Sequence, residues 1–359
     1  MMHKYSVTAD LPLIDADRRR YPLQWDALNS KLRELEQRDG HLLGVLEHLY
    51  NHQLATGFIR DDLHRLQCFR FPHPDDADRF LSVQYNPARV NRLKLRPEAL
   101  PPARGDAVNS DCFLCATNIQ WQYHGLEFGY AIEEGGVPYH IWMNPFPLLP
   151  VHLVVAAQAH IPQSWESGAD GSGRLSVHRI VANLAALAGR MPGYVGFYNG
   201  DGAGASLPAH FHYQFFRRRT DAPHFPLEQA PVRELNEGCA VILDYPVEGM
   251  RWQADDNVAT INRAARWIED WLLARTGLRP SLSANFLAMC DAGTGRLQIY
   301  FVPRDREMCH SPHMAGMIGG LEVLGELVLT TGQEKHDLDR GMMDYCTIER
   351  VLRDIRVPL

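Results

Sequence analysis

Three long segments of the chain repeat their apolar residues every three or four positions, which is the spacing of an amphipathic helix. The first covers residues 24–66, the second covers residues 176–190 and the third covers residues 256–277. In the third segment we expect six side chains to face inward: Val258, Ile261, Ala265, Trp267, Ile268 and Leu272. Each segment therefore presents one apolar stripe to a core.

Short runs of apolar and β-branched residues predict strands between these helices. We expect them over residues 80–96, within 121–156, over 193–198 and over 208–217. A further pair, 281–289 and 296–304, flanks the sequence Asp-Ala-Gly-Thr-Gly, which is typical of a hairpin turn. The connections are a proline-rich linker at 97–111, a Gly/Ser-rich loop at 168–173 and a proline- and charge-rich stretch at 219–235. The pattern predicts an α+β protein with two units, residues 1–225 and 226–359.

Composition narrows the class of protein. With 359 residues, 45% of them hydrophobic, the chain can bury a large core. A net charge of −7 gives no general attraction for nucleic acid or an acidic membrane, and we expect neither as a partner. Seven cysteines without a disulfide-like framework suit a reducing compartment, and no signal peptide or run of 18 apolar residues is seen. We therefore expect a soluble cytoplasmic protein.

The strongest chemical signal lies in residues 199–214, where a glycine-rich loop leads into His210-Phe-His212-Tyr-Gln214. In an extended strand the two histidines and the glutamine would share one face. A neutral imidazole can attack phosphorus with one nitrogen while a carbonyl holds the N–H of the other. Glycines let backbone amides approach phosphate oxygens, and Asn199 and Ser206 add neutral donors. The alternative is a buried edge strand with two hydrogen-bonded histidines beside an ordinary turn.

This motif resembles the signature of the transferase branch of the histidine-triad superfamily. The branch includes galactose-1-phosphate uridylyltransferase, diadenosine tetraphosphate phosphorylase and the GDP-hexose phosphorylases. The resemblance implies that His212 is the nucleophile, and that Gln214 hydrogen-bonds the phosphoryl group of a covalent nucleotidyl-histidine. The histidine-triad hydrolases usually carry a third histidine where this chain has the glutamine. The residues expected to contact the substrate are Asn144, Asn199, Gly202, Gly204, Ser206 and Arg304.

Two other stretches carry part of the resemblance. Residues 144–155 resemble the superfamily's Asn-x-x-Pro-x-x-x-Gly-His-hydrophobic segment, although Val151 stands where the family usually has glycine. A proline-rich turn before a strand is the alternative reading. Residues 283–326 resemble the C-terminal half of the GDP-hexose phosphorylases. The implied fold is an antiparallel sheet with packed helices, duplicated as two histidine-triad-type halves of which only the first is catalytic.

Several arginines and lysines are candidates for binding phosphate. Arg304 and Arg306 follow the hairpin, and a guanidinium suits a phosphate better than an ammonium does. Surface arginines after a strand are the commoner explanation. The cations of residues 92–96 favour an edge strand that faces solvent. Those of residues 217–219 favour a run of solvent-exposed charges.

A metal site is the third implication of the resemblance. Bacterial uridylyltransferases bind a metal through a Cys-x-x-Cys pair, a middle histidine and the first histidine of the His-x-His pair. Carried over, the ligands of a structural zinc or iron are Cys112, Cys115, His160 and His210, and His152 is an alternative ligand. The alternative interpretations are two reduced cysteines in the core and a thioredoxin-like redox pair. No βαβ pattern surrounds the pair, which argues against the redox interpretation.

The sequence therefore favours a nucleotidyltransferase or phosphorylase. The expected donor is a nucleoside diphosphate sugar or a dinucleoside polyphosphate, and the acceptor is phosphate or a sugar phosphate. The alternatives are a nucleotide hydrolase, which glutamine at position 214 disfavours because an amide is a poor acid–base group, and a non-catalytic nucleotide-binding protein. Since the branch often dimerises, a homodimer is also an open expectation.

Overall fold

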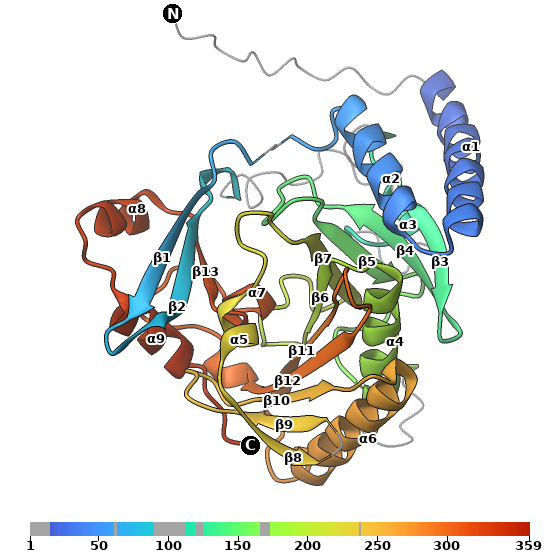
Figure 1. Cartoon of the computed structure of the whole chain (residues 1–359). Helices are drawn as coiled ribbons and strands as arrows, with labels where there is room; N and C mark the ends of the chain where they lie inside the picture. Colours follow the sequence, from blue (N-terminus) through green and yellow to red (C-terminus); the bar gives the residue numbers. More distant parts are fainter. Residues whose placement is uncertain (1–14, 61–62, 90–111, 120–124, 166–172, 237) are drawn as a thin grey trace, which may run out of the picture.

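The computed structural model describes residues 15–60, 63–89, 112–119, 125–165, 173–236 and 238–359. Ten strands form one antiparallel sheet (Figure 1). In spatial order they are β3 (Tyr130–Glu134), β4 (Val137–Met143), β5 (Leu153–Ala157), β7 (His212–Arg217), β6 (Tyr194–Asn199), β11 (Leu282–Cys290), β12 (Leu297–Asp305), β10 (Met250–Gln253), β9 (Cys239–Ile242) and β8 (Val232–Asn236).

The strand order repeats between the two halves of this sheet. In each half, three strands are followed by a helix and two more strands, and the last strand lies between the third and the fourth. The fourth strands, β6 and β11, pair at the centre, where Asn199 lies opposite Asn285. The expected division after residue 225 lies in the connection between β7 and β8. The duplication into two histidine-triad-type halves stays a prediction.

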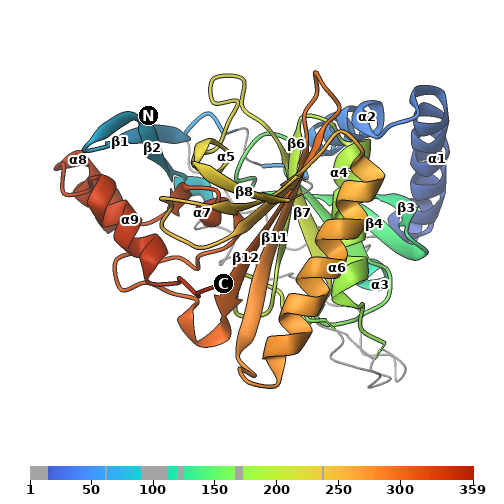
Figure 2. The same ribbon diagram turned by 60° about the horizontal axis from the view of Figure 1, so that its bottom comes forward.

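Two long helices cover one face of the sheet (Figure 2). Helix α4 (Val177–Arg190) begins at Ser176, whose side chain accepts from the N–H of Arg179, and α6 (Asn257–Thr276) begins in the same way at Asp256. Their apolar stripes join the sheet in one core, in which Leu184 and Ile268 are fully buried. Both helices lie where the periodicity predicts them. Val258 is the exception to the expected inward set, because it is 69% exposed in the first turn of α6.

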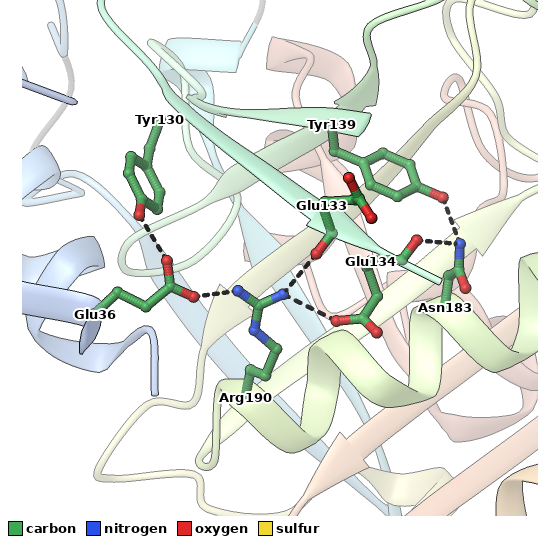
Figure 3. A network of polar contacts seen from close by, with 7 residues as sticks. All are labelled: Glu36, Tyr130, Glu133, Glu134, Tyr139, Asn183 and Arg190. Atoms are coloured by element: carbon green, nitrogen blue, oxygen red, sulfur yellow. Dashed lines mark hydrogen bonds and ion pairs between the residues drawn. The ribbon is translucent and has the colours of Figure 1, made fainter. Parts of the chain in front are cut away.

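The segment predicted as one helix over residues 24–66 forms two, α1 (Asp15–Asp39) and α2 (Leu43–Ala55). Gly40 between them has φ +68°, which ends α1. Figure 3 shows the polar contacts that attach α1 to α4 and to β3. Arg190 forms ion pairs with Glu36 of α1 and with Glu134, the latter at 2.9 Å. Tyr130 donates to the other oxygen of Glu36 at 2.6 Å.

A second layer covers the opposite face of the sheet. It contains β1 (Gln67–His73), β2 (Asp76–Tyr85) and β13 (Glu326–Leu329), which form a three-stranded sheet in which β13 runs parallel to β2. The helices of this layer are α5 (Pro226–Gln229), α7 (Gly320–Val323), α8 (Gly332–Asp339) and α9 (Tyr345–Arg353). Two short elements complete the chain, α3 (Ala116–Ile119) and a 3-10 helix, η3 (Arg306–Met308). The N-terminal hairpin and the C-terminal segment thus close one face of the molecule together.

The expected fold class, an antiparallel sheet with packed helices, is confirmed. The strand expected over 208–217 begins only at His212, and β2 ends at Tyr85. The predicted cationic stretch 92–96 and the linker 97–111 lie outside the described residues, as does most of the loop 168–173. Among the described helices, none combines the length and apolar character needed to cross a membrane.

Candidate functional site

The glycine-rich loop and strand β7 meet at the centre of the large sheet. Phe211, Tyr213 and Phe215 are fully buried in the core beneath the helices. His212 and Gln214 therefore point to the other face, as the alternation predicts. His210 precedes the strand rather than belonging to it, because residues 207–210 form a turn in which the N–H of His210 donates to Leu207 O.

Hydrogen bonds determine which nitrogen of His212 carries the proton. Its Nδ1 lies 2.8 Å from the carbonyl oxygen of His210. Because a carbonyl only accepts, Nδ1 carries the hydrogen and Nε2 keeps its lone pair. Burial lowers the pKa of His212 to about 4, so the ring is neutral at pH 7. The side chain of Gln163 pairs with the backbone N–H and C=O of His212, at 2.7 Å each, and fixes its position.

Gln214 is oriented by a histidine from the neighbouring strand. The backbone N–H of Leu148 donates to His152 Nδ1 at 3.1 Å, so this ring carries its hydrogen on Nε2. That nitrogen lies 3.0 Å from Gln214 Oε1. The amide oxygen therefore faces His152, and the NH₂ group is the part of Gln214 available to a ligand.

A cavity of about 300 Å³ lies between the large sheet and residues 314–331 of the C-terminal segment. Gln214 lines this cavity, whereas His212 is buried and is not among the lining residues. Four of the expected substrate-contacting or catalytic residues line it: Asn199, Gly204, Ser206 and Gln214. Opposite them lie Gly319–Glu322 and two threonines, Thr330 and Thr331. Phe197, Leu148, Met314 and Met317 give it an apolar side. Polar groups on one wall and apolar groups on another are typical of a small-molecule site.

The other expected substrate contacts lie elsewhere. Asn144 uses its side-chain oxygen to accept from the N–H of Phe146, and Gly202 packs against Arg306. Arg304 is 0% exposed and donates to Asn285 Oδ1 and Ile318 O, so the expected contact with phosphate is not formed by this guanidinium. None of the three lines the cavity.

The cavity also contains residues that no motif indicated. Arg89 lines it and donates to the carbonyl oxygen of Phe146 at 2.6 Å. Gly204 has φ +95°, and a Cβ there would lie 2.3 Å from the Cα of Gly319. Only glycine therefore allows the loop to meet the C-terminal wall. Neither Arg89 nor residues 314–331 stand in a recognisable pattern with the histidine motif, so sequence reasoning had no signal for them.

The four expected metal ligands come together beside the start of β7. Cys112 Sγ and Cys115 Sγ lie 3.2 and 3.6 Å from His210 Nδ1, and Cys115 Sγ lies 3.2 Å from His160 Nδ1. All four ligand atoms lie within 4.8 Å of one another. His152 is not in this cluster, so it is not the alternative ligand.

The donor set of this cluster fits a structural zinc or iron site. His210 Nε2 donates to Ala157 O at 2.8 Å, so its Nδ1 lone pair faces the sulfurs. The hydrogen bond between the thiols lowers the pKa of Cys112 and raises that of Cys115. Two thiols and two imidazoles are the usual ligands of closed zinc sites.

Val151, which stands where the resemblance expects glycine, has φ +51°. This left-handed conformation is costly for a β-branched residue. The side chain of Val151 is also buried, with an exposed fraction of 3%. The turn before His152 therefore keeps the backbone shape that glycine favours, despite the substitution.

The comparisons with known proteins agree with this architecture. Residues 49–217 match a family described as a domain of unknown function (DUF4922). No curated protein sequence matches the chain. The structure of yeast Ap4A phosphorylase Apa2 in complex with AMP is similar, with a TM-score of 0.54 and 15% sequence identity, over 87% of this chain and 96% of that one. The complex of the same enzyme with Ap4A gives a TM-score of 0.53 and 14% identity, over 87% and 98% of the two chains. The chain therefore has the same fold as yeast Ap4A phosphorylase Apa2.

Proposed function

We propose that the protein is a nucleotidyltransferase of the phosphorylase type. Nε2 of His212 attacks the α-phosphorus of a dinucleoside polyphosphate or a nucleoside diphosphate sugar. A P–N bond forms, and the bond from phosphorus to the leaving phosphate oxygen breaks. Phosphate or a sugar phosphate then attacks the same phosphorus, forms a new P–O bond and releases the neutral imidazole.

The observation that carries this proposal is the proton position on His212. An imidazole whose Nδ1–H is held by His210 O has its lone pair on Nε2, as a nucleophile requires. The NH₂ group of Gln214 and the amides of the glycine loop are the donors expected to stabilise negative charge on the phosphoryl oxygens. The apolar side of the cavity suits a nucleobase. Among the donors, Ap4A is the first choice, because the similar structures contain Ap4A and AMP.

We also propose that Cys112, Cys115, His160 and His210 hold zinc or iron in a structural role. The ion would tie residues 112–115 to the turn that precedes the strand carrying His212. We assign it no part in the chemical step. The homodimer expected from the sequence stays a prediction.

The direct test is incubation of the protein with Ap4A labelled at the α-phosphorus, without acceptor, followed by a search for acid-labile, alkali-stable label. We expect label on the wild type and none on His212→Ala, whereas His224→Ala, which changes an exposed histidine, keeps it. Added phosphate should then release ADP. Release of AMP by water at the same rate would favour the hydrolase alternative. Tight binding of AMP without label or turnover from any donor would favour a non-catalytic protein.

A further inference from the structure

Arg304, on strand β12 of the half without the histidine motif, is an unusual buried cation. Its side chain is fully buried, and no ion pair to it occurs within the described residues. It donates to Asn285 Oδ1 at 2.5 Å and to the carbonyl oxygen of Ile318 at 3.0 Å. Glu322 acts on it electrostatically, but that carboxylate accepts from the N–H of Gly319. Burying a guanidinium against neutral oxygens costs stability, so we infer that Arg304 has a role other than stabilising the fold.

The guanidinium determines the orientation of the next amide. Because Arg304 can only donate, Asn285 turns its oxygen toward it and its NH₂ group toward the cavity side. That group donates to Asn199 Oδ1 at 2.8 Å and to Ala203 O at 2.9 Å. Asn199 Oδ1 also accepts from the N–H of Gly320 at 2.9 Å. One chain of hydrogen bonds thus runs from β12 through β11 to both walls of the cavity.

The glycine loop itself rests on β11. Ser283 Oγ donates to Asp201 O at 2.7 Å, and the N–H of Gly200 donates to Ala284 O at 2.9 Å. Asn199 Nδ2 donates to Gly204 O at 3.2 Å. A Cβ at Gly200 would lie 2.5 Å from Ser283 Oγ, so the loop and the strand are in close contact. The shape of the loop is therefore set by residues of the second half.

We propose that Arg304 and Asn285 are positioning residues, which hold the glycine loop and the Gly319–Gly320 wall in the geometry that binds a nucleotide phosphate. The proposal rests on the proposed function. In this proposal, strands β11 and β12 of the second half support the glycine-rich loop of the first half and fix its shape. Amides held in place before the substrate arrives stabilise developing charge without a reorganisation cost.

Two properties of the full-length variants test the proposal. Arg304→Met keeps the volume but removes the charge and the donors, and Arg304→Lys keeps the charge and part of the donor capacity. For Arg304→Met we expect amide exchange of residues 200–206 to accelerate about tenfold or more. We expect kcat for Ap4A with phosphate to fall roughly 10- to 100-fold, with a smaller change in KM. Arg304→Lys should recover part of both losses.

Asn183→Leu is the matched control. Asn183 is also a buried amide with two protein hydrogen bonds, to Glu134 O and to the Tyr139 hydroxyl, but it lies on helix α4 on the other face of the sheet (Figure 3). We expect it to lower thermal stability without accelerating exchange in the loop or changing kcat of the folded protein.

The outcomes separate this proposal from the function on which it rests. If Arg304→Met is folded and keeps both the loop protection and kcat of the wild type, the positioning role is overturned. If it loses stability alone, as Asn183→Leu does, the positioning role is overturned as well. If the wild type has no phosphorylase activity, the proposed function fails, and exchange in residues 200–206 with and without AMP still measures the positioning effect. A loss of loop protection in Arg304→Met with recovery in Arg304→Lys then supports it.

Discussion

At the scale of single residues, groups that can donate but not accept hydrogen bonds determine the orientation of the side chains at the cavity. The backbone N–H of Leu148 must donate, so the His152 ring must donate to Gln214 in turn. We therefore expect His152→Phe to lower kcat for Ap4A about tenfold, because the amide of Gln214 is then free to turn its oxygen toward the phosphate. His152→Gln, which keeps a donor, should restore part of the rate.

A double-mutant cycle checks this argument. If His152 acts through Gln214, the effect of His152→Phe disappears in the background of Gln214→Ala. Fully additive effects of the two substitutions on kcat would contradict it. Thermal unfolding of each variant shows whether the turn at residues 148–152 has stayed folded.

Glu326 gives a pH-dependent prediction at the same scale. Burial raises the pKa of this carboxyl to about 7, although Gln84 donates to it at 3.0 Å. Because the folded-state pKa is above the unfolded value, the folded protein holds the proton longer, and stability falls as pH rises from about 4.5 to 7. The loss approaches roughly 3 kcal/mol above pH 7.

Glu326→Gln keeps the acceptor for Gln84 and removes the ionisation. We expect this variant to be more stable than the wild type at pH 8, with the difference vanishing near pH 4.5. Denaturant unfolding at both pH values measures the change. A difference that is equal at the two pH values would show that the substitution acts through packing instead.

At the scale of elements, the sequence predicted the helices and strands that are specified by local patterns of residues. The hairpin expected at 281–289 and 296–304 is β11 (Leu282–Cys290) and β12 (Leu297–Asp305), because turn residues and alternation specify it locally. The break at Gly40 was missed because leucine spacing continues across it. The pairing of β13 with β2 joins residues far apart in the chain, and periodicity carries no information on such partners.

The candidate site divides in the same way. The motif at 210–214 predicted which face of β7 carries His212 and Gln214, since alternation is a property of one strand. It gave no indication that Asn285 and Arg304 would support the loop, because that depends on β6 pairing with β11. Arg304 was expected at the phosphate as an accessible cation, and only tertiary structure places it behind the cavity wall.

The cluster of Cys112, Cys115, His160 and His210 connects separate segments of the chain, because it joins the loop at 112–115 to the residues just before β7. We expect the purified protein to contain about one zinc or iron per chain, as a closed four-ligand site does. A chelator should lower its melting temperature, since removing a ligand bound only to the folded state lowers stability. Cys115→Ser should lose the metal and show no further effect of the chelator.

Cys346→Ser is the control for this experiment, since Cys346 is an exposed cysteine outside the cluster. Elemental analysis and thermal unfolding measure metal content and stability on the same samples. A metal-free wild type whose melting temperature does not respond to added zinc or iron would contradict the metal site.

At the scale of the whole molecule, the two repeats of the large sheet depend on each other. The central pairing joins β6 to β11, and helices α4 and α6 share one core. The second layer crosses the same boundary, since β2 comes from the N-terminal part and β13 from the C-terminal part. Part of the apolar surface of each half is therefore buried against the other half.

This interdependence predicts how the two halves behave when they are separated. Residues 1–225 expressed alone expose the edge of β6 and lose Asn285 beneath the glycine loop, so we expect aggregation and no labelling by Ap4A. Co-expression of residues 1–225 with 226–359 should restore a soluble complex with labelling at His212, because the pairing of β6 with β11 and of β2 with β13 needs no covalent link. Size-exclusion chromatography and the labelling assay measure both properties. A soluble, labelled fragment 1–225 would show that the first half is autonomous, and the second half would then not be the template on which its phosphate-binding loop depends.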